Sequence, residues 1–501
     1  MIDTTALREK VLDLAIRGKL VPQDPNDEPA SVLLERIREQ KKQMVKEGKL
    51  KAKDIKDDSI IYKEDNCYYE KFSDGTVKNI TEEIPFDIPL TWSWCRLNDL
   101  FNVCSSKRVL QSEWKKEGIP FYRAREIAKL SIEGCVKNDL FISTEHYQHL
   151  KEVYGVPKSG DLMVTGVGTI GKVYIVKEND KFYYKDASVL CFQNYYGGII
   201  AEYGKYLIES DLLQSQIHNK TYGNTVDTIT ITTANKYLCA LPPLKEQRRI
   251  VETINNVFNI SNSIQKNKLE LENIVKLIKE KVLELAIQGK LVPQDENDEP
   301  ASILLERIRA ERKPQLGKKY VESYIYKGDD NCYYEKITEN KECINEFLPF
   351  DLPDGWAYTR LENILDYEQP TDYIVKSTNY NNNFSTPVLT AGKSFIIGYT
   401  NETNGIKKEL PVIIFDDFTT ESKYVDFPFK VKSSAMKILF TYNKFINLKF
   451  LYYVMQTICC NHDNHKRYWI SEYSKFIIAL PPLKEQNLIV NKIEYLFSLI
   501  N

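Results

Sequence analysis

Three glycines in segment 166–171, which reads GVGTIG, have the spacing of a dinucleotide-binding fingerprint. That fingerprint needs a strand before the glycines and a helix after them, so that the pyrophosphate lies at the helix N-terminus. Here Gly171 is followed by KVYIV, a run of β-branched and aromatic residues that is typical of a strand. We therefore predict a hairpin loop and no nucleotide site. The glycines suit a plain turn and a loop that approaches DNA equally well.

Thiols and imidazoles cluster in the segment CCNHDNH, which contains Cys459, Cys460, His462 and His465. Tetrahedral zinc sites usually separate their cysteines by two to four residues, and two adjacent thiols rarely both point at one metal. We therefore predict no metal site here. The ten cysteines include no CxxC pair, so we expect reduced thiols and no disulfide framework.

Other catalytic signatures are absent from the sequence. It has no GxxxxGK(S/T) loop to cradle phosphates, no GxSxG elbow, no HExxH helix and no (D/N/S)PP(Y/F/W) tetrapeptide of amino-methyltransferases. We therefore expect a chain that is not an enzyme by itself.

Contact with nucleic acid is the chemistry that the remaining residue types offer. Arg123 and Arg125, in PFYRAREI, carry paired donors that can read guanine. Hydroxyl, amide and amine side chains in loop-like segments suit phosphates and base edges. For each of them, an exposed polar side chain without a partner is the alternative. The candidates are Arg123, Arg125, Thr165, Thr169, Lys172, Lys220, Tyr222, Asn224, Thr225, Thr390, Lys393, Ser394, Thr419, Thr420, Lys423, Lys432, Ser433 and Ser434.

Length and charge restrict the class of protein. A chain of 501 residues exceeds the roughly 250–300 residues at which single cores stop growing, so it predicts more than one domain. The net charge of −2, from 68 Lys plus Arg and 70 Asp plus Glu, argues against non-specific coating of nucleic acid. There is no run of about 18 apolar residues and no signal-peptide pattern at the start, so we expect a cytoplasmic protein without a membrane span.

Four segments of the chain occur twice and define its organisation. Residues 7–38 recur at 278–309, 61–71 at 325–336, 84–97 at 348–361, and LPPLKEQ stands at both 241–247 and 480–486. Between these flanks lie two inserts of little mutual resemblance, Asn98–Ala240 and Glu362–Ala479. The order is therefore scaffold, insert, scaffold, insert, scaffold.

A long helix is predicted from Pro243 to Gln288. Its apolar residues recur every seven positions, which keeps one stripe facing a partner helix and is typical of a coiled coil. At about 1.5 Å per residue it would be roughly 65–70 Å long. Segments 481–501 and 1–17 match its first and last parts, so the chain ends would supply a second, antiparallel copy. The predicted seam residues are Ile250, Val257, Ile264, Leu271, Ile278, Leu285, Ile489, Leu496, Leu7 and Leu14.

Both inserts contain strand-like runs followed by helical segments. The fold class predicted is α+β: two mixed domains separated by a pair of long antiparallel coiled-coil helices, with a pseudo-two-fold internal repeat. The expected boundaries are 1–60 for an N-terminal scaffold that ends in a mobile linker, 61–240 for the first domain, 241–320 for the central scaffold, 321–479 for the second domain and 480–501 for the last helix. The strand-like runs are Asp161–Lys177, Ala187–Phe192, Pro411–Phe415 and Lys437–Phe440, and the expected helices are Gly204–His218 and Leu448–Thr457.

Together these features resemble the specificity subunit of type I restriction–modification systems. The resemblance covers essentially the whole chain and is carried by the twice-used LPPLKEQ, the twice-used LAI(R/Q)GKLVPQ, and the alternation of repeated helices with divergent inserts. The segments SGDLMVTGVGTIGKVYIV and TPVLTAGKSFIIGYT look like parts of target-recognition domains of that family. The family usually has its long helices near the middle and the end of the chain, whereas here part of one module lies at the N-terminus.

The resemblance implies a function for the whole chain. Each insert would read one half of a bipartite, asymmetric site on double-stranded DNA, and the coiled coil would set the spacing. Two modification subunits would methylate adenine, and restriction subunits would translocate DNA and cut it. The chain itself would hold no cofactor, because S-adenosylmethionine, ATP and Mg would bind to the partner subunits.

Two other interpretations are consistent with the sequence. The chain could be the DNA-recognition subunit of a methyltransferase or nuclease outside the type I group. It could also be an assembly scaffold that does not bind DNA.

Overall fold

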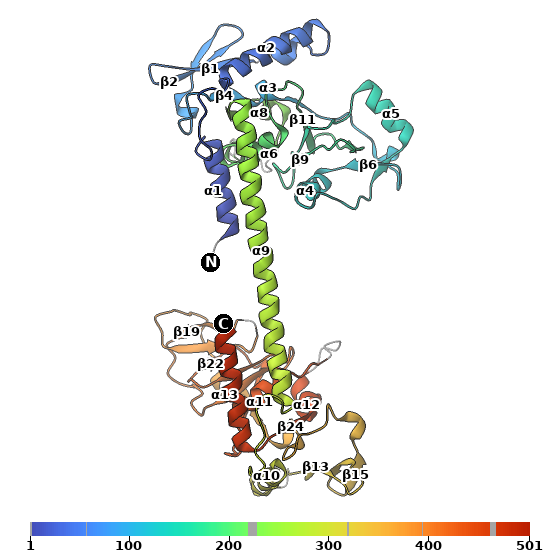
Figure 1. Ribbon diagram of the computed structural model, residues 1–501, viewed down its shortest axis with the longest axis vertical. Helices are drawn as coiled ribbons and strands as arrows, with labels where there is room; N and C mark the ends of the chain where they lie inside the picture. The colour runs from blue at the N-terminus through green and yellow to red at the C-terminus, as the bar shows by residue number, and fades with distance from the viewer. Residues whose placement is uncertain are drawn as a thin grey trace. The chain divides into compact units, whose positions relative to one another are not determined.

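The computed structural model describes residues 3–56, 58–218, 228–317, 320–392, 394–460 and 467–500. The chain divides into two compact units, Met1–Lys268 (unit 1) and Leu269–Asn501 (unit 2), shown in Figure 1. Each unit mixes helices and strands, which confirms the predicted α+β class. Over the described ranges, no helix combines the length and the apolar character that crossing a membrane requires.

Unit 1 contains the first set of repeated flanks and the first insert. Its helices are α1 (Thr4–Ile16), α2 (Ala30–Lys46), α3 (Leu97–Leu100), α4 (Ala124–Glu133), α5 (Thr144–Val153), α6 (Ala201–Glu209), α7 (Asp211–His218), α8 (Ile231–Asn235) and the first part of α9 (Leu244–Ile287). Its strands are β1 (Ser59–Glu64), β2 (Cys67–Phe72), β3 (Val77–Asn79), β4 (Ser93–Arg96), β5 (Asn102–Cys104), β6 (Ile119–Tyr122), β7 (Phe141–Ile142), β8 (Leu162–Thr165), β9 (Val173–Ile175), β10 (Tyr183–Tyr184), β11 (Val189–Gln193) and β12 (Leu238–Leu241).

Unit 2 contains the second part of α9, the second insert and the last helix. Its other helices are α10 (Ala301–Leu316), α11 (Leu448–Met455), α12 (Tyr468–Ser471) and α13 (Leu483–Ile500). Its strands are β13 (Ser323–Lys327), β14 (Tyr333–Ile337), β15 (Asn340–Cys343), β16 (Ala357–Arg360), β17 (Asp366–Glu368), β18 (Thr386–Leu389), β19 (Ile396–Thr400), β20 (Val412–Asp416), β21 (Ser422–Val425), β22 (Lys430–Val431), β23 (Met436–Phe440) and β24 (Ile477–Leu480). The strand-like runs predicted inside both inserts and the helix over Leu448–Thr457 are therefore confirmed, with small shifts of their ends. The helical segment predicted over Gly204–His218 is two helices, α6 and α7, which are separated at Ser210.

A four-stranded antiparallel sheet, β5-β11-β8-β9, organises the insert of unit 1. Its inner strands β8 and β11 read LMVT and VLCFQ, and all of these residues except the last are buried. Because side chains alternate along a strand, Leu190 and Phe192 pack into a core shared with α6 and the start of α9, whereas Val189 and Cys191 pack into a second core. Two covered faces explain why these strands are apolar throughout.

The insert of unit 2 has the same sheet topology although its sequence differs. Its large sheet has the order β17-β23-β20-β21, and each of its pairings is antiparallel as in unit 1. In the small sheets, β6 pairs in parallel with β10 and antiparallel with β7, and β18 pairs in parallel with β22 and antiparallel with β19. The flanking sheets β1-β2-β3 and β13-β14-β15, and the ribbons β4–β12 and β16–β24, also correspond. The predicted internal repeat therefore extends into the divergent inserts.

The segment Lys46–Asp58, predicted to be a mobile linker, is partly folded against α2. Leu50 is buried, and its backbone N–H donates to the carbonyl of Met44 at 3.2 Å. The buried ammonium of Lys41 donates to Asp58 at 3.0 Å. The buried side chain of Leu50 and the ion pair between Lys41 and Asp58 therefore hold this segment against the rest of unit 1. The charged composition of the segment did not predict these contacts.

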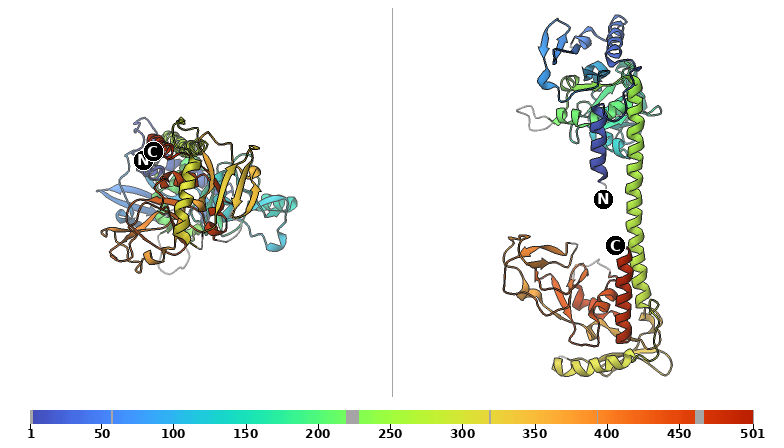
Figure 2. Two further views of the ribbon diagram at one scale, coloured as in Figure 1. Left: turned by 90° about the horizontal axis from the view of Figure 1, so that it is seen from below. Right: turned by 60° about the vertical axis from the view of Figure 1, so that its left-hand side comes forward.

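The terminal helices pack on α9, one within each unit (Figures 1 and 2). In unit 1, Arg8 of α1 donates to Asn262, and its guanidinium lies 4.6 Å from the centroid of the Phe258 ring. In unit 2, the ammonium of Lys279 lies 5.5 Å from the ring centroid of Phe497 in α13. The contacts between Gln23 and Glu246 and between Gln294 and Glu485 lie at the other ends of these helix pairs. Along each pair, residue numbers therefore rise on one helix and fall on the other, so both pairs are antiparallel.

The predicted seam residues differ in burial along α9. Ile250 and Ile489 are fully buried, while Val257, Leu285, Leu496, Leu7 and Leu14 are half-buried. The side chains in the middle of the helix are exposed: Ile264 by 38%, Leu271 by 61% and Ile278 by 41%. Helix pairing over these middle turns therefore stays a prediction.

In each unit, the repeated motifs meet where one helix of the antiparallel pair ends and the other helix begins. In unit 1, the amide of Gln23 donates to the carbonyl of Gly18 at 3.2 Å and to Glu246 at 2.8 Å. In unit 2, Gln294 donates to Gly289 at 2.5 Å and to Glu485 at 3.2 Å. The GKLVPQ and LPPLKEQ segments are thus two halves of one joint, present once in each unit.

The glutamine of LPPLKEQ fastens each insert to this joint. Gln247 and Gln486 are both completely buried. The carbonyl of Gln247 accepts the N–H of Ile200 at the start of α6, and its amide donates to the carbonyl of Pro242. Gln486 accepts the N–H of Asn447, the N-cap of α11, and donates to Pro481. The repeated side chains therefore face inward, and their repetition reflects two equal internal joints.

Substitution of Gly18 tests how tightly this joint is packed. Gly18 has φ +67°, and a Cβ there would lie 2.4 Å from Cγ of Pro89. Gly48, in the same unit, has φ +73° with no atom within 4 Å of its Cβ position. We expect Gly48→Ala to lower the free energy of unfolding by about 1–2 kcal/mol from the left-handed conformation alone. Gly18→Ala should cost a further ~1–3 kcal/mol from overpacking. Urea denaturation of both variants measures this difference, and equal losses would contradict the packing argument.

Candidate nucleic-acid interface

Three loops meet at one edge of the insert in unit 1, and three equivalent loops meet in unit 2. We call each set a three-loop surface. In unit 1 it comprises residues 123–125 after β6, 165–172 between β8 and β9, and 185–188 after β10. In unit 2 it comprises 390–392 and 394–395 after β18, 416–422 between β20 and β21, and 432–435 after β22. The same strand pairings position both sets.

Equivalent backbone hydrogen bonds join the loops of each surface. In unit 1 the N–H of Lys185 donates to the carbonyl of Tyr122 at 2.8 Å, and that of Gly166 donates to Ser188 at 2.9 Å. In unit 2 the N–H of Lys432 donates to Leu389 at 3.1 Å, and that of Asp417 donates to Ala435 at 3.2 Å. The parallel strand pair and the hairpin thus bring together segments that are far apart in sequence.

The glycine segment forms the hairpin loop that the sequence predicts. Strands β8 and β9 pair antiparallel on either side of it, with Val164 opposite Val173, so no helix follows the glycines. The buried hydroxyl of Thr165 donates to the carbonyl of Thr169 at 2.5 Å and accepts the N–H of Lys172 at 2.9 Å. Thr165 therefore shapes the loop, while the side chains of Thr169 and Lys172 are exposed.

Arg123 and Arg125 lie at the start of α4 in a cluster with two carboxylates. Arg123 donates to Glu126 at 3.0 Å and to Asp139 at 2.6 Å. Arg125 donates to the same Glu126 and to the other oxygen of Asp139 at 2.6 Å. Burial opposes the ionisation of Glu126, but the hydrogen bonds from the two arginines prevail and lower the pKa of its carboxyl. The cluster is therefore electrically balanced, and reading of guanine by these arginines stays a prediction.

The loops of unit 2 use hydroxyl and carboxylate groups in the same way. The hydroxyl of Thr390 donates to the carbonyl of Ser394 at 2.7 Å. Asp416 accepts the N–H groups of Phe418 and Thr419 at 2.9 and 3.0 Å, and Thr420 has φ +60° at the tip of the β20–β21 turn. Thr390 and Asp416 thus fix the shapes of two loops.

Exposed polar side chains remain on both surfaces after the loop-shaping residues are set aside. Lys423 of β21 and Thr420 are half-buried. The exposed members in unit 1 are Arg125, which is paired with Glu126 and Asp139, and Thr169, Lys172 and Lys185. Those in unit 2 are Ser394, Thr419, Lys432, Ser433 and Ser434. Amine and hydroxyl groups on short loops can donate to phosphates and to base edges.

Some predicted residues lie outside the described ranges. They are Lys220, Tyr222, Asn224, Thr225 and Lys393, together with His462 and His465 of the Cys/His segment. Within the described ranges, no group of three or more His, Cys, Asp or Glu side chains is arranged to hold a metal ion.

Lys185 was not among the residues selected from the sequence. It is exposed and takes the position in unit 1 that Lys432 takes in unit 2, one residue after the parallel strand of the small sheet. The two segments, YYKDAS and FKVKSSA, share a lysine followed by a serine within three residues. A similarity this short cannot be recognised in the sequence alone, and it becomes visible only because β10 and β22 occupy equivalent positions in the two small sheets.

The part of the chain that carries the first three-loop surface is similar to a known family of sequences. Residues 89–273 match the family described as type I restriction modification DNA specificity domain. A specificity subunit of the Escherichia coli type I restriction enzyme EcoR124I/EcoR124II is 48% identical over 155 residues, which are 30% of this chain and 35% of that relative. The specificity subunit of the E. coli enzyme EcoAI is 28% identical over 424 residues, covering 72% of this chain and 62% of the relative. The matched regions thus span less than two thirds of either relative's length.

Comparison with solved structures finds a chain whose fold is similar to that of this protein. A chain from a structural study of complex assembly and conformational transition of the type I R-M system superposes with a TM-score of 0.50 at 16% identity. The match covers 83% of this chain and 92% of that chain.

Proposed function

We propose that the chain is the DNA-reading subunit of a type I restriction–modification complex. The match of residues 89–273 to the type I restriction modification DNA specificity domain supports this proposal. In this proposal each three-loop surface binds one half of a bipartite, asymmetric site on double-stranded DNA. The chain itself is not an enzyme and directs methylation or cutting by partner subunits.

The observation that carries the proposal is the pair of equivalent three-loop surfaces with different side chains. A protein that reads two unlike half-sites needs the same backbone frame twice, so that each frame meets the duplex in the same way. It also needs different loop residues, because base edges in the major groove present distinct patterns of donors and acceptors. The glycine loop of unit 1 and the threonine-rich turn of unit 2, on topologically identical hairpins, meet both requirements.

Helix α9 is proposed to set the spacing between the half-sites. Its 44 residues correspond to a length of about 66 Å at about 1.5 Å per residue. One turn of B-DNA is about 34 Å, so such a helix matches a spacing of up to about two turns.

The partners are proposed from the family as well. Two modification subunits would methylate adenine with S-adenosylmethionine, and restriction subunits would use ATP and Mg to translocate and cut DNA. The near-zero net charge of this chain supports such a division, because the partners can then supply much of the phosphate neutralisation that affinity requires.

Exchange of one insert tests the function. Replacing Asn98–Ala240 by the insert of a relative, in the complete complex, should change the methylated sequence in one half-site and leave the other half-site and the spacer as they were. Long-read sequencing of methylated adenines in a host that expresses the chimera measures all three. A chimera that methylates an unchanged sequence would refute the assignment of the reader.

Removal of single lysines tests the three-loop surface of unit 1. Because Lys185 is exposed beside the hairpin loop, Lys185→Ala should weaken binding to a duplex with the mapped site. If the lysine contacts a phosphate, the slope of log K against log salt should fall by about one. Lys71→Ala removes the same charge from an exposed position of strand β2 and should leave both quantities unchanged. Fluorescence anisotropy over a salt series measures them, and equal effects of the two substitutions would exclude a specific contact at Lys185.

A change in the length of α9 tests the spacing role. Deletion of residues 265–271 shortens the helix by about 10 Å, or about three base pairs at ~3.4 Å each. The mapped spacer should shorten accordingly. The full-length control Ile264→Ala, at an exposed position, should keep the original spacer. An unchanged spacer in an active deletion variant would show that α9 does not set the distance.

A further inference from the structure

Two pairs of cysteines face each other across neighbouring strands in unit 1. Cys104 of β5 is opposite Cys191 of β11, and Cys95 of β4 is opposite Cys239 of β12. Directly opposed residues of antiparallel strands have Cα atoms about 4.5–5.5 Å apart and side chains on one face. A disulfide needs Cα atoms about 4.4–6.8 Å apart. The backbone therefore permits a disulfide in either pair, although all four thiols are free in this structure.

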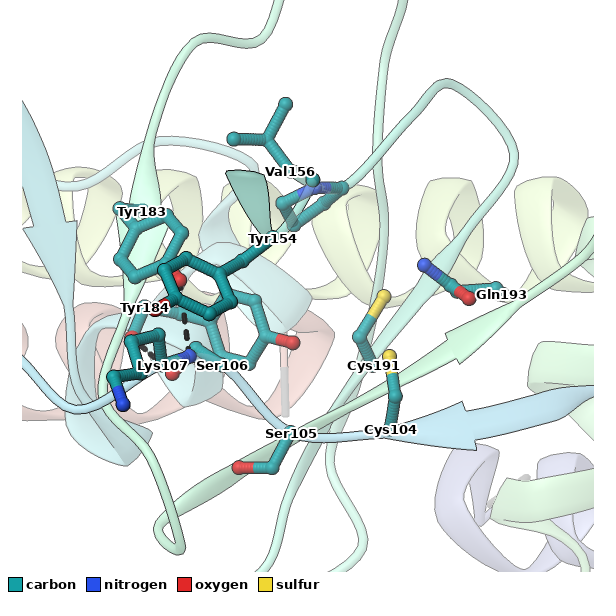
Figure 3. Close-up of a pocket in the computed structure, with 12 residues that line it drawn as sticks. Cys104, Ser105, Ser106, Lys107, Tyr154, Val156, Tyr183, Tyr184, Cys191 and Gln193 are labelled. Atoms are coloured by element: carbon teal, nitrogen blue, oxygen red, sulfur yellow. Dashed lines mark hydrogen bonds between the residues drawn. The ribbon is translucent and has the colours of Figure 1, made fainter. Parts of the chain in front are cut away.

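The first pair opens into a cavity of about 290 Å³ (Figure 3). Ser106, Tyr154 and Tyr184 line this cavity together with both thiols. Cys104 is partly exposed, whereas Cys191 is 1% exposed. Figure 3 shows the two sulfur atoms as neighbours at one side of the cavity. A small thiol reagent can therefore reach Cys104, and the thiol of Cys191 lies beside it.

The two thiols of this pair differ in acidity. The neighbouring thiol of Cys191 lowers the pKa of Cys104 in spite of burial. The same thiol–thiol interaction, together with burial, raises the pKa of Cys191, whose thiol donates to the carboxylate of Asp161 at 3.9 Å. Because the thiolate is the attacking form, Cys104 is suited to attack first. Cys191 is suited to resolve the product by attack on its neighbour.

The second pair has the same strand geometry in a closed environment. The thiol of Cys95 donates to the carbonyl of Cys239 at 3.8 Å, and that of Cys239 donates to the carbonyl of Tyr237 at 3.6 Å. Both residues are at most 1% exposed, and burial raises the pKa of both thiols. This pair is an internal control: it has the geometry for a disulfide but offers neither access nor an acidic thiol.

We propose that Cys104 is a thiol-exchange site and that Cys104 and Cys191 form a reversible disulfide in the folded protein when a low-molecular-weight disulfide such as oxidised glutathione is present. The Cys104 thiolate attacks one glutathione sulfur, so that a mixed disulfide forms and the other glutathione leaves as a thiolate. Cys191 then loses its proton and attacks the Cys104 sulfur, which releases the second glutathione. Two cysteine thiols are oxidised by two electrons, one oxidised glutathione is reduced to two thiols, and the two cysteine protons go to them.

The bond would act next to the first three-loop surface. Ser105, the residue after Cys104, accepts the N–H of Ala187 through its hydroxyl at 3.3 Å. The hydroxyl of Ser106 donates to the carbonyl of Tyr184 at 2.7 Å. A disulfide that ties β5 to β11 therefore also restrains the strand and loop that carry Lys185. The chemistry stands independently of the proposed DNA binding, because it rests on the cysteines alone.

The test uses the full chain treated under native conditions with oxidised glutathione. Free thiols are then alkylated, and the peptides are mapped by mass spectrometry with and without dithiothreitol. We expect a Cys104–Cys191 link that dithiothreitol removes, no Cys95–Cys239 link, and a higher midpoint of thermal unfolding for the oxidised protein. Modification of the exposed Cys135 shows that the oxidant was active.

Two variants separate the roles of the two thiols. Cys191→Ser should stop at a stable glutathione adduct on Cys104, because the resolving thiol is absent. Cys104→Ser should leave Cys191 unmodified, because that thiol is buried. The proposal is overturned if Cys104 stays unmodified while Cys135 reacts, or if the Cys95–Cys239 link forms as fast as the Cys104–Cys191 link.

Discussion

The buried amide of Gln247, with its counterpart Gln486, is the interaction on which the rest of each unit depends. In each unit, the glutamine amide donates to the carbonyl of the first proline in the Pro-Pro turn. Its carbonyl accepts the N–H of the residue that caps the N-terminus of a helix in the insert. An unpaired buried polar group costs about 1–3 kcal/mol, so loss of either partner is penalised. The amide therefore fixes the insert relative to the start of the helix, and the orientation of the large sheet follows from that.

The same frame carries two unlike sequences because the physics of its sheets is not specific to individual residues. Strands β8, β11, β20 and β23 need apolar side chains on both faces, since each face packs into a separate core. Many combinations of Val, Ile, Leu, Met and Phe fill such cores at similar volume. The loops at the sheet edge have no such restriction beyond their turns. This explains how the inserts diverge in sequence while their strand order stays the same.

Charge is distributed differently on the two surfaces. In unit 1, the carboxylates of Glu126 and Asp139 neutralise Arg123 and Arg125. The exposed cations that remain on this three-loop surface are Lys172 and Lys185. In unit 2, Lys432 stands beside two serines, and the buried Lys430 and Lys437 are paired with Glu402 and Asp417. The lysines within the cores support structure, whereas those on the loops remain available to a ligand.

The sequence by itself determined the modular organisation, because long repeats and a seven-residue apolar period depend only on local order along the chain. It located α9 within a residue at either end, the terminal helices, the glycine hairpin, and the insert strands β8, β9, β11, β20 and β23. The meeting of three loops was decided only by the tertiary structure, since it arises from hydrogen bonds between strands about 60 residues apart, such as β6 and β10. The tertiary structure also decided that Thr165 and Thr390 shape loops while Lys172 and Lys432 are exposed. It likewise placed Lys185 beside the hairpin loop, at the position that Lys432 takes in unit 2. Nor can spacing along the chain show that Cys104 and Cys191 share an open cavity while Cys95 and Cys239 are sealed, because accessibility depends on what packs over each strand pair.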